Sequence, residues 1–215
     1  MLNKSVPVIS IIPHYSLDDG QDACPTGIRE YLLCSECEKY LNANYEKPFL
    51  KQWTVDSPLP DSMAQDAVHS VAYDYPMFKL FHLSILFRSS VSALPIFRKV
   101  NLRAHEERIR LMLISKDPGK DWEYPIFGRV VLHGGKVERR LITAPIAGRY
   151  EGHVVYEQMY GGVVWHILVS SHRNDSFCQA GLQPTGHITL FAVPWNEVWG
   201  VQDASIALKR ADLKK

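Results

Sequence analysis

Two pairs of adjacent glycines in the second half of the chain constrain its fold most strongly. Gly134-Gly135 and Gly161-Gly162 each lie between runs of residues that are typical of β-strands. Tight two-residue hairpin turns need positive φ angles, which glycine adopts without a steric penalty. The sequence therefore predicts two β-hairpins. The expected strands span residues 129–133, 136–143, 154–160 and 163–170, with a further strand at 187–193.

The first half of the chain has a helical pattern instead. Residues 76–88 begin with a proline, which suits a first helical turn, and are apolar around nearly the whole circumference. This segment is expected to be a central, buried helix. A second helix is expected from an N-cap at Asn101 to about residue 114, with one apolar face and alternating charges on the other. The apolar residues of that face are Leu102, Ile109 and Leu113.

A shorter helix is expected near the N-terminus. Cys37, Leu41 and Tyr45 follow one another at four-residue steps, so residues 34–45 should form a helix with these three side chains facing the core. Pro48 is expected to mark its exit. Residues 1–30 are short apolar runs broken by proline and glycine, which favours strand pieces and loops.

These patterns predict an α+β fold with an irregular N-terminal knuckle, two main helices and a C-terminal antiparallel sheet with Gly-Gly hairpins. We expect the parts to pack as one domain. The parts are a knuckle region at 1–53, a loop or linker at 54–75, a helical segment at 76–118, and a β-rich region at 119–215 that ends in a short helix at 203–213.

Composition favours a soluble cytoplasmic protein. The chain has 215 residues, of which 46% are hydrophobic and 22% are charged, as in ordinary globular proteins. No segment approaches the roughly 20 apolar residues of a membrane span, so no membrane association is expected. Four cysteines in a chain of this length indicate metal or redox chemistry in a reducing compartment rather than a disulfide framework.

The spacing of Cys34 and Cys37 is typical of half a structural zinc site. A complete site needs four ligands, and Cys24 and His14 are the candidates for the remainder, because Cys178 lies far along the chain in the β-rich half. Two other interpretations stay open. The thiols could be left over from a lost metal site, or they could be a redox pair at the start of a helix.

A basic surplus lies between residues 98 and 140, although the net charge of the chain is only +1. These cations could follow a phosphate backbone, or they could belong to a solvated helix face together with neighbouring glutamates. The candidate nucleic-acid contacts are Arg98, Lys99, Arg103, Arg139 and Arg140.

Three further residues have specific expected roles. Arg88 closes the apolar helix, so its guanidinium needs an acidic partner. The candidate partners are Glu30, Glu38 and Glu46. Trp195 and Trp199 either pack between elements or anchor a partner protein, because exposed aromatic side chains are good interface anchors.

Residues 27–38, followed by 45–49, resemble a group of uncharacterised bacterial and phage proteins related to HNH endonucleases. The similarity continues through residues 75–88 and 102–113. Members of that group carry an upstream C-x₂-C pair and a histidine within a Ser-His-Ile-Ile-Pro-like segment. Here Ser10 stands at the position of that histidine, and no upstream cysteine pair is present.

The resemblance implies an HNH-related protein without catalytic power, because the histidine that deprotonates the attacking water is replaced. It would act as a nucleic-acid-associated or regulatory module in a bacterial or phage conflict system. If the chain were an enzyme, the resemblance would make it a metal-dependent HNH-type nuclease. The alternative is a protein-interaction subunit or inhibitor that binds a partner protein through its β-hairpin half.

Overall fold

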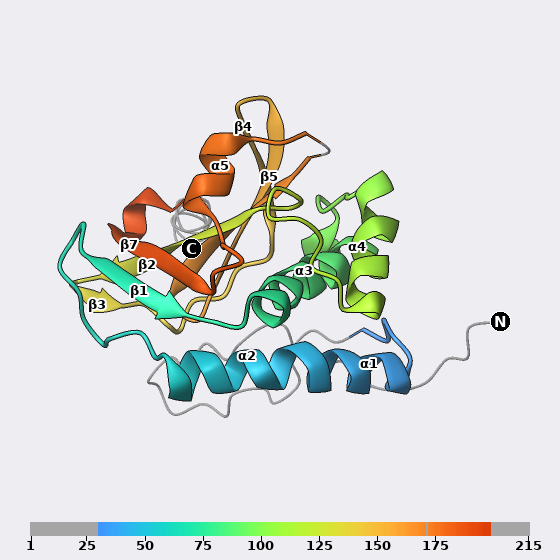
Figure 1. The fold of residues 1–215 in the computed structure, drawn as a ribbon, viewed down its shortest axis with the longest axis horizontal. Helices are drawn as coiled ribbons and strands as arrows, with labels where there is room; N and C mark the ends of the chain where they lie inside the picture. Colours follow the sequence, from blue (N-terminus) through green and yellow to red (C-terminus); the bar gives the residue numbers. More distant parts are fainter. Residues whose placement is uncertain (1–29, 171, 199–215) are drawn as a thin grey trace, which may run out of the picture.

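A computed structural model describes residues 30–170 and 172–198. The fold is α+β, as expected: a helical N-terminal region, two main helices and one short helix accompany a mixed seven-stranded sheet (Figure 1). The predicted strand pieces of residues 1–29 and the closing helix at 203–213 lie outside the described residues. Within the described residues, no helix has both the length and the apolar character needed to cross a membrane.

The first described helices follow one another without a break and form one continuous rod, which we call the N-terminal rod (Figure 1). It consists of α1 (Ser35–Leu41), η1 (Asn42–Glu46), α2 (Lys47–Lys51) and η2 (Gln52–Asp56), where η1 and η2 are π-helical. The expected exit at Pro48 is therefore wrong. Pro48 lies in the first turn of α2, directly after a wide π-turn, where a residue without an N–H is tolerated.

The rod packs against the core through Leu41, Tyr45, Phe49 and Trp53, which are all buried. A step of four residues along an α-helix rotates by about 400°, so such a series would drift by about 40° per step. The wider turns of η1 and η2 offset this drift and keep the four side chains in line. The prediction that Cys37 faces the core is wrong. Cys37 is exposed, and the buried residues of α1 are Glu38 and Leu41.

The predicted central helix is confirmed as α3 (Tyr75–Val91). Asp74 caps it by accepting a hydrogen bond from the Met77 amide at 2.9 Å, and most of its residues are buried. The second predicted helix is α4 (Ala104–Ser115), which packs against α3. Asn101 does not cap α4 directly, since its side chain accepts from the Arg103 amide, one residue before the helix begins.

The sheet has the strand order β1-β7-β2-β6-β5-β4, with β3 paired to β2. The strands are β1 (Val68–Ala72), β2 (Ile126–His133), β3 (Lys136–Val137), β4 (Ile146–Tyr150), β5 (His153–Tyr160), β6 (Val163–Val169) and β7 (His187–Pro194). The predicted hairpin around Gly161-Gly162 is confirmed, because Tyr160 pairs with Val163 across this turn. Both of these glycines have positive φ angles.

Three expectations about the sheet need correction. The sheet is not wholly antiparallel, because β7 returns after a long connection that includes α5 (Asp175–Ala180) and pairs parallel to β2. The hairpin around Gly134-Gly135 is short, since its second strand spans only Lys136–Val137. Residues 54–75 are not simply a loop, because they contain the edge strand β1.

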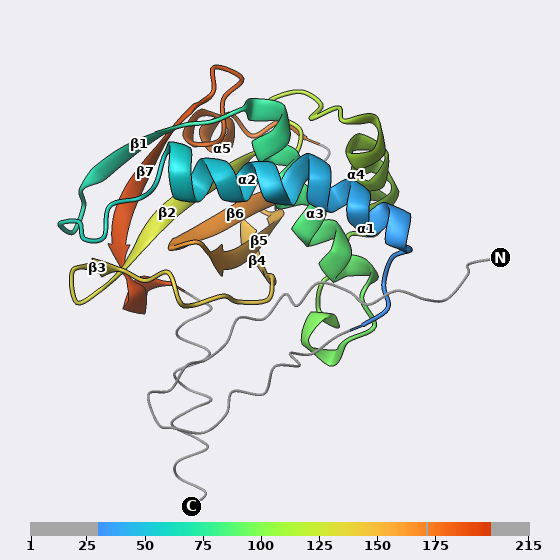
Figure 2. The same ribbon diagram turned by 90° about the horizontal axis from the view of Figure 1, so that it is seen from below.

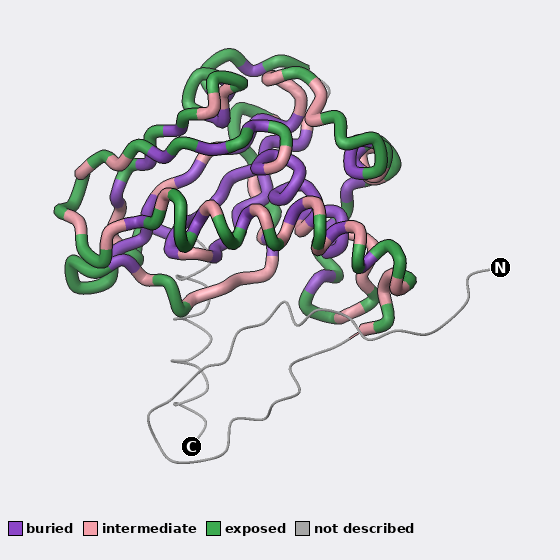
Figure 3. Tube along the Cα trace, turned by 60° about the horizontal axis from the view of Figure 1, so that its bottom comes forward, coloured by how far each residue is buried: buried purple, intermediate pink, exposed green. Residues whose placement is uncertain are grey.

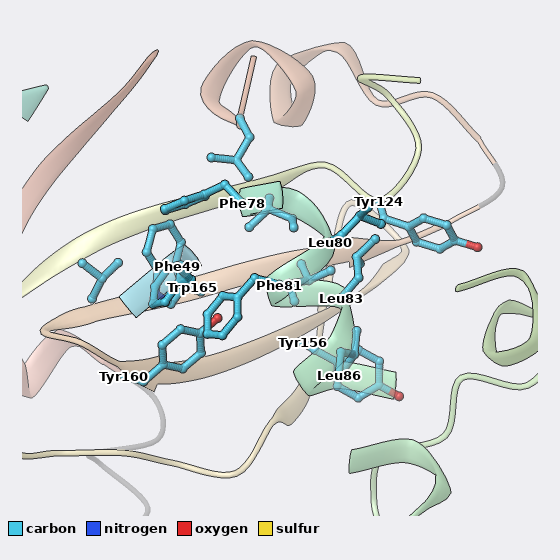
Figure 4. Close-up of a cluster of buried hydrophobic side chains, with 14 of the residues drawn as sticks. Phe49, Phe78, Leu80, Phe81, Leu83, Leu86, Tyr124, Tyr156, Tyr160 and Trp165 are labelled. Atoms are coloured by element: carbon cyan, nitrogen blue, oxygen red, sulfur yellow. The ribbon is translucent and has the colours of Figure 1, made fainter. Parts of the chain in front are cut away.

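The N-terminal rod and α3 cover one face of the sheet, while α5 lies on the other (Figure 2). Figure 3 shows the buried trace running through α3 and the central strands. The centre of this core is aromatic, and Figure 4 shows Phe49 and Phe81 beside Tyr160. The rings of Phe49 and Phe81 are stacked with centroids 3.7 Å apart. Trp53 meets Trp165 of β6 at 5.5 Å, which ties the rod to the sheet.

Lys79 is a buried lysine in α3. Its Nζ donates hydrogen bonds to the Tyr75 hydroxyl at 3.2 Å and to the Lys120 carbonyl at 2.8 Å, which ties the loop after α4 to α3. Burial lowers the pKa of Lys79 from 10.5 to about 8, with partial compensation by nearby acidic groups, Glu123 foremost. The folded protein therefore binds this proton less tightly than the unfolded chain does.

This difference in pKa predicts a stability that rises with pH. Between about pH 8 and 10.5 the unfolded chain binds more protons at Lys79 than the folded protein does, so the contribution of Lys79 to the free energy of unfolding increases with pH in this window. From pH 7.5 to 9.5 we expect the wild type to gain about 2 kcal/mol relative to Lys79→Met. Urea unfolding of both proteins measures this, with Lys47→Met, at an exposed position, as control. A pH-independent difference would contradict the prediction.

Candidate functional site

A groove of about 1060 Å³ opens beside the N-terminal rod. Four separate parts of the chain form it: the rod, the C-terminal part of α3, the loop at 58–61, and the segment from 139 to the β5–β6 turn. Both π-helical stretches contribute side chains, among them Glu46 of η1 and Trp53 of η2. Short π-helical insertions occur frequently at functional sites. We call this feature the rod groove.

The floor of the rod groove is aromatic and uncharged. Phe49, Phe81 and Tyr160 line it and contact one another edge-on or stacked. Beneath it, the Tyr160 hydroxyl hydrogen-bonds His82 Nδ1 and accepts from Gln158 Nε2 at 3.4 Å. Burial raises the pKa of Tyr160 well above its usual value and lowers the pKa of His82 well below its own, so both side chains are neutral at pH 7.

A buried ion pair forms one wall of the rod groove. Arg88 Nη1 lies 2.6 Å from Glu46 Oε1, and only 3% of the arginine side chain is exposed. Among the three glutamates predicted as its partner, Glu46 is therefore the one in direct contact. Glu38 is buried close enough that Arg88 partly offsets the rise in its pKa caused by burial. Glu30 instead accepts hydrogen bonds from the segment after α3, at Ser92 and Ala93.

The rim of the rod groove has polar and apolar parts. Arg139 holds the 58–61 loop, because its guanidinium contacts the Asp61 carboxylate at 2.9 Å and the Leu59 carbonyl at 2.6 Å. On the rod side, Leu50 is 60% exposed, next to the buried Phe49. A concave surface lined mainly by apolar and aromatic side chains, with a few polar groups, is typical of a binding site.

The two thiols predicted as metal ligands lie together at the start of α1. Cys34 Sγ accepts a hydrogen bond from the Cys37 amide at 3.4 Å, and this interaction lowers the pKa of Cys34. Hydrogen bonding to Cys34 and partial burial raise the pKa of Cys37. The other candidate ligands, Cys24 and His14, lie outside the described residues.

The described residues supply two of the four ligands that a structural zinc ion requires. Across 30–170 and 172–198, no three histidine, cysteine, aspartate or glutamate side chains are grouped as a metal site. Zinc at Cys34 and Cys37 stays a prediction that depends on the residues before Glu30.

The structure places the five predicted nucleic-acid contacts on two segments. Arg98, Lys99 and Arg103 are exposed in the connection between α3 and α4. Arg139 and Arg140 follow β3, which Figure 2 shows at the other end of the molecule. This second pair is bound to carboxylates, Arg139 to Asp61 and Arg140 to Glu138.

The predicted tryptophan anchor is described only in part. Trp195 is exposed, and its ring lies 4.8 Å from the His133 ring, while Trp199 lies outside the described residues. In the hairpin around Gly161-Gly162, His166 pairs with Glu157, and His153 contacts Ser170.

The fold and the rod groove define an α+β protein with a groove beside its N-terminal rod. No family profile, curated protein or solved structure matches the chain. Sequence reasoning missed the groove because its walls come from four separated segments. The available signal was the four-residue spacing of Leu41, Tyr45, Phe49 and Trp53, which extends through Pro48.

Proposed function

We propose that this chain is a regulatory module that acts by binding a partner protein, and that the rod groove is its binding site. The observation that carries the proposal is the combination of an aromatic, uncharged floor with an exposed leucine at its edge. The proposal keeps the non-catalytic regulatory role that the HNH-related resemblance implies. The sequence analysis expected the partner to bind the β-hairpin half, whereas the proposal places the binding site in the rod groove. The β5–β6 turn contributes Gly161 to this groove.

The chemistry of the rod groove suits an apolar protein segment. Aromatic side chains and arginines are enriched in protein interfaces, and the groove presents Phe49, Phe81 and Tyr160 together with Arg88 and Arg139. Both arginines already pair with a carboxylate, so binding an apolar segment leaves no guanidinium without its counter-charge.

Nucleic acid is the second candidate ligand, and it fits the described surface less well. Phosphate binding requires cations that are free to replace counterions along a backbone. Arg139 and Arg140 are paired with Asp61 and Glu138, and they lie apart from the cations that follow α3. Arg98, Lys99 and Arg103 are exposed and lie outside the rod groove.

A photo-crosslinking amino acid at Leu50 tests the proposal. In the cells from which the gene comes, we expect it to capture one discrete partner polypeptide, because the side chain lies at the groove edge. The matched control is the same amino acid at Leu111, which is 52% exposed on α4 and does not line the groove. Gel analysis with mass spectrometry identifies the products.

The outcomes are distinct. A polypeptide captured at Leu50 and absent at Leu111 supports the proposal. A product that disappears on nuclease treatment favours nucleic acid, whereas equal labelling at both positions, or none at either, contradicts a specific site in the rod groove.

A further inference from the structure

The first turn of the N-terminal rod carries two thiols side by side. Cys34 Sγ accepts a hydrogen bond from the Cys37 amide at 3.4 Å. Both side chains are exposed and neither is part of a disulfide. Two adjacent sulfurs are therefore open to reagents in solution.

An apolar hollow of about 380 Å³ lies next to Cys37. Its walls come from the rod, α3 and α4, and include Tyr40, Phe87 and Leu113. At its edge, Ile114 is an exposed large apolar side chain. The hollow offers a contact surface to the apolar part of a molecule whose sulfur approaches the thiols.

We propose that Cys34 and Cys37 form a redox-active dithiol that exchanges with an external disulfide bond. Cysteines three positions apart at the start of a helix lie close enough for a disulfide, because the Cα atoms that such a bond joins are about 4.4–6.8 Å apart. The hydrogen bond from the Cys37 amide already holds the Cys34 sulfur beside the backbone of Cys37. This site is separate from the rod groove and does not depend on the function proposed for it.

The exchange involves two substitutions at sulfur. Cys34 gives up its proton and attacks one sulfur of the substrate disulfide, so that a mixed disulfide forms and the first substrate thiol leaves. Cys37 then gives up its proton and attacks the Cys34 sulfur, which forms the Cys34–Cys37 disulfide and releases the second thiol. The substrate gains two electrons and two protons, and the protein loses the same number.

Cys178 provides an internal control. It is a free thiol in α5, and it is buried, so it should not react with a disulfide in solution. The proposal therefore predicts selective oxidation of the N-terminal pair. Cys24 lies outside the described residues and is replaced in Cys24→Ser, so that Cys34, Cys37 and Cys178 are the thiols left to assign.

The test uses the full chain with Cys24→Ser, equilibrated with oxidised and reduced glutathione, then alkylated and analysed by mass spectrometry. As the oxidised fraction rises, we expect both Cys34 and Cys37 to lose reactivity together, and dithiothreitol to restore both. Cys37→Ser should instead accumulate a glutathione adduct on Cys34. Cys178→Ser should behave as its parent.

Several results would overturn the proposal. One is complete alkylation of Cys34 and Cys37 after oxidation, and another is a Cys37→Ser variant that forms no adduct. Zinc retained by the wild-type chain, with Cys24 present, at about one ion per chain, lost on Cys34→Ser and protecting the thiols from oxidation, would assign the pair to metal instead. Where exchange occurs, faster reaction with a disulfide-bonded apolar peptide than with glutathione identifies a protein substrate, and the reverse identifies a small thiol.

Discussion

Replacing Arg88 with methionine is expected to lower the free energy of unfolding by about 3–5 kcal/mol, the usual cost of removing one partner from a buried ion pair. Arg88 lies 2.6 Å from Glu46, and its charge also offsets the buried carboxyl group of Glu38. Methionine fills similar space but supplies no charge. Two acidic side chains would then share a poorly solvated site.

Urea unfolding of the variant measures this loss, and two further variants interpret it. Glu46→Gln in the Arg88→Met background should recover part of the stability, because it removes one of the uncompensated charges. Arg110→Met is the matched control. It breaks the Arg110–Glu107 pair on the surface of α4, where an ion pair contributes only about 0–1 kcal/mol. Equal losses in Arg88→Met and Arg110→Met would show that burial of the first pair has no energetic consequence.

The elements that sequence reasoning predicted well are those with strong local signals. Residues 76–88 are apolar on all sides and start with proline, so a buried helix is the structure that satisfies them. Gly161-Gly162 permits a tight turn between two strand-forming runs. In both cases the information lies within one segment of chain, and the structure confirms the element with boundaries shifted by only a few residues.

The elements that were missed depend on partners far along the chain. β1 lies in a segment with prolines and polar residues, and it becomes a strand by pairing with β7. The direction of β7 is set by the connection through α5, which carries no periodic signal. Tertiary context of this kind overrides local propensity.

The candidate site shows the same division. The sequence indicated that Arg88 needs an acidic partner and that Glu46 was a candidate, because an unpaired buried charge is costly. The rod groove could not be predicted, since it needs the rod, α3, the 58–61 loop and the β5–β6 turn in one place. A periodicity analysis that allows four-residue steps to continue through a proline would have predicted the rod. It would not have predicted which segments of the chain pack against the rod.

Phe49 is one of the four buried side chains that pack the N-terminal rod against the rest of the core. Its ring stacks on Phe81 and Trp53 and meets Tyr160 edge-on. Phe49→Ala removes most of this buried surface. At this position, side chains from η2, α3 and β5 pack closely around the ring. We expect a loss of about 3–5 kcal/mol in the free energy of unfolding, the usual cost of deleting a buried phenylalanine side chain.

The neighbouring Leu50 provides the control for this variant, because it is exposed and Leu50→Ala should change stability by no more than about 0.5 kcal/mol. Urea unfolding gives both values, and hydrogen exchange locates the effect: amides of residues 35–56 should lose protection first, since the rod is held by its row of buried side chains. A cost below about 1 kcal/mol for Phe49→Ala would contradict this packing. The rod would then be attached mainly by its ion pair and by the Tyr45 hydroxyl, which donates to the Leu113 carbonyl.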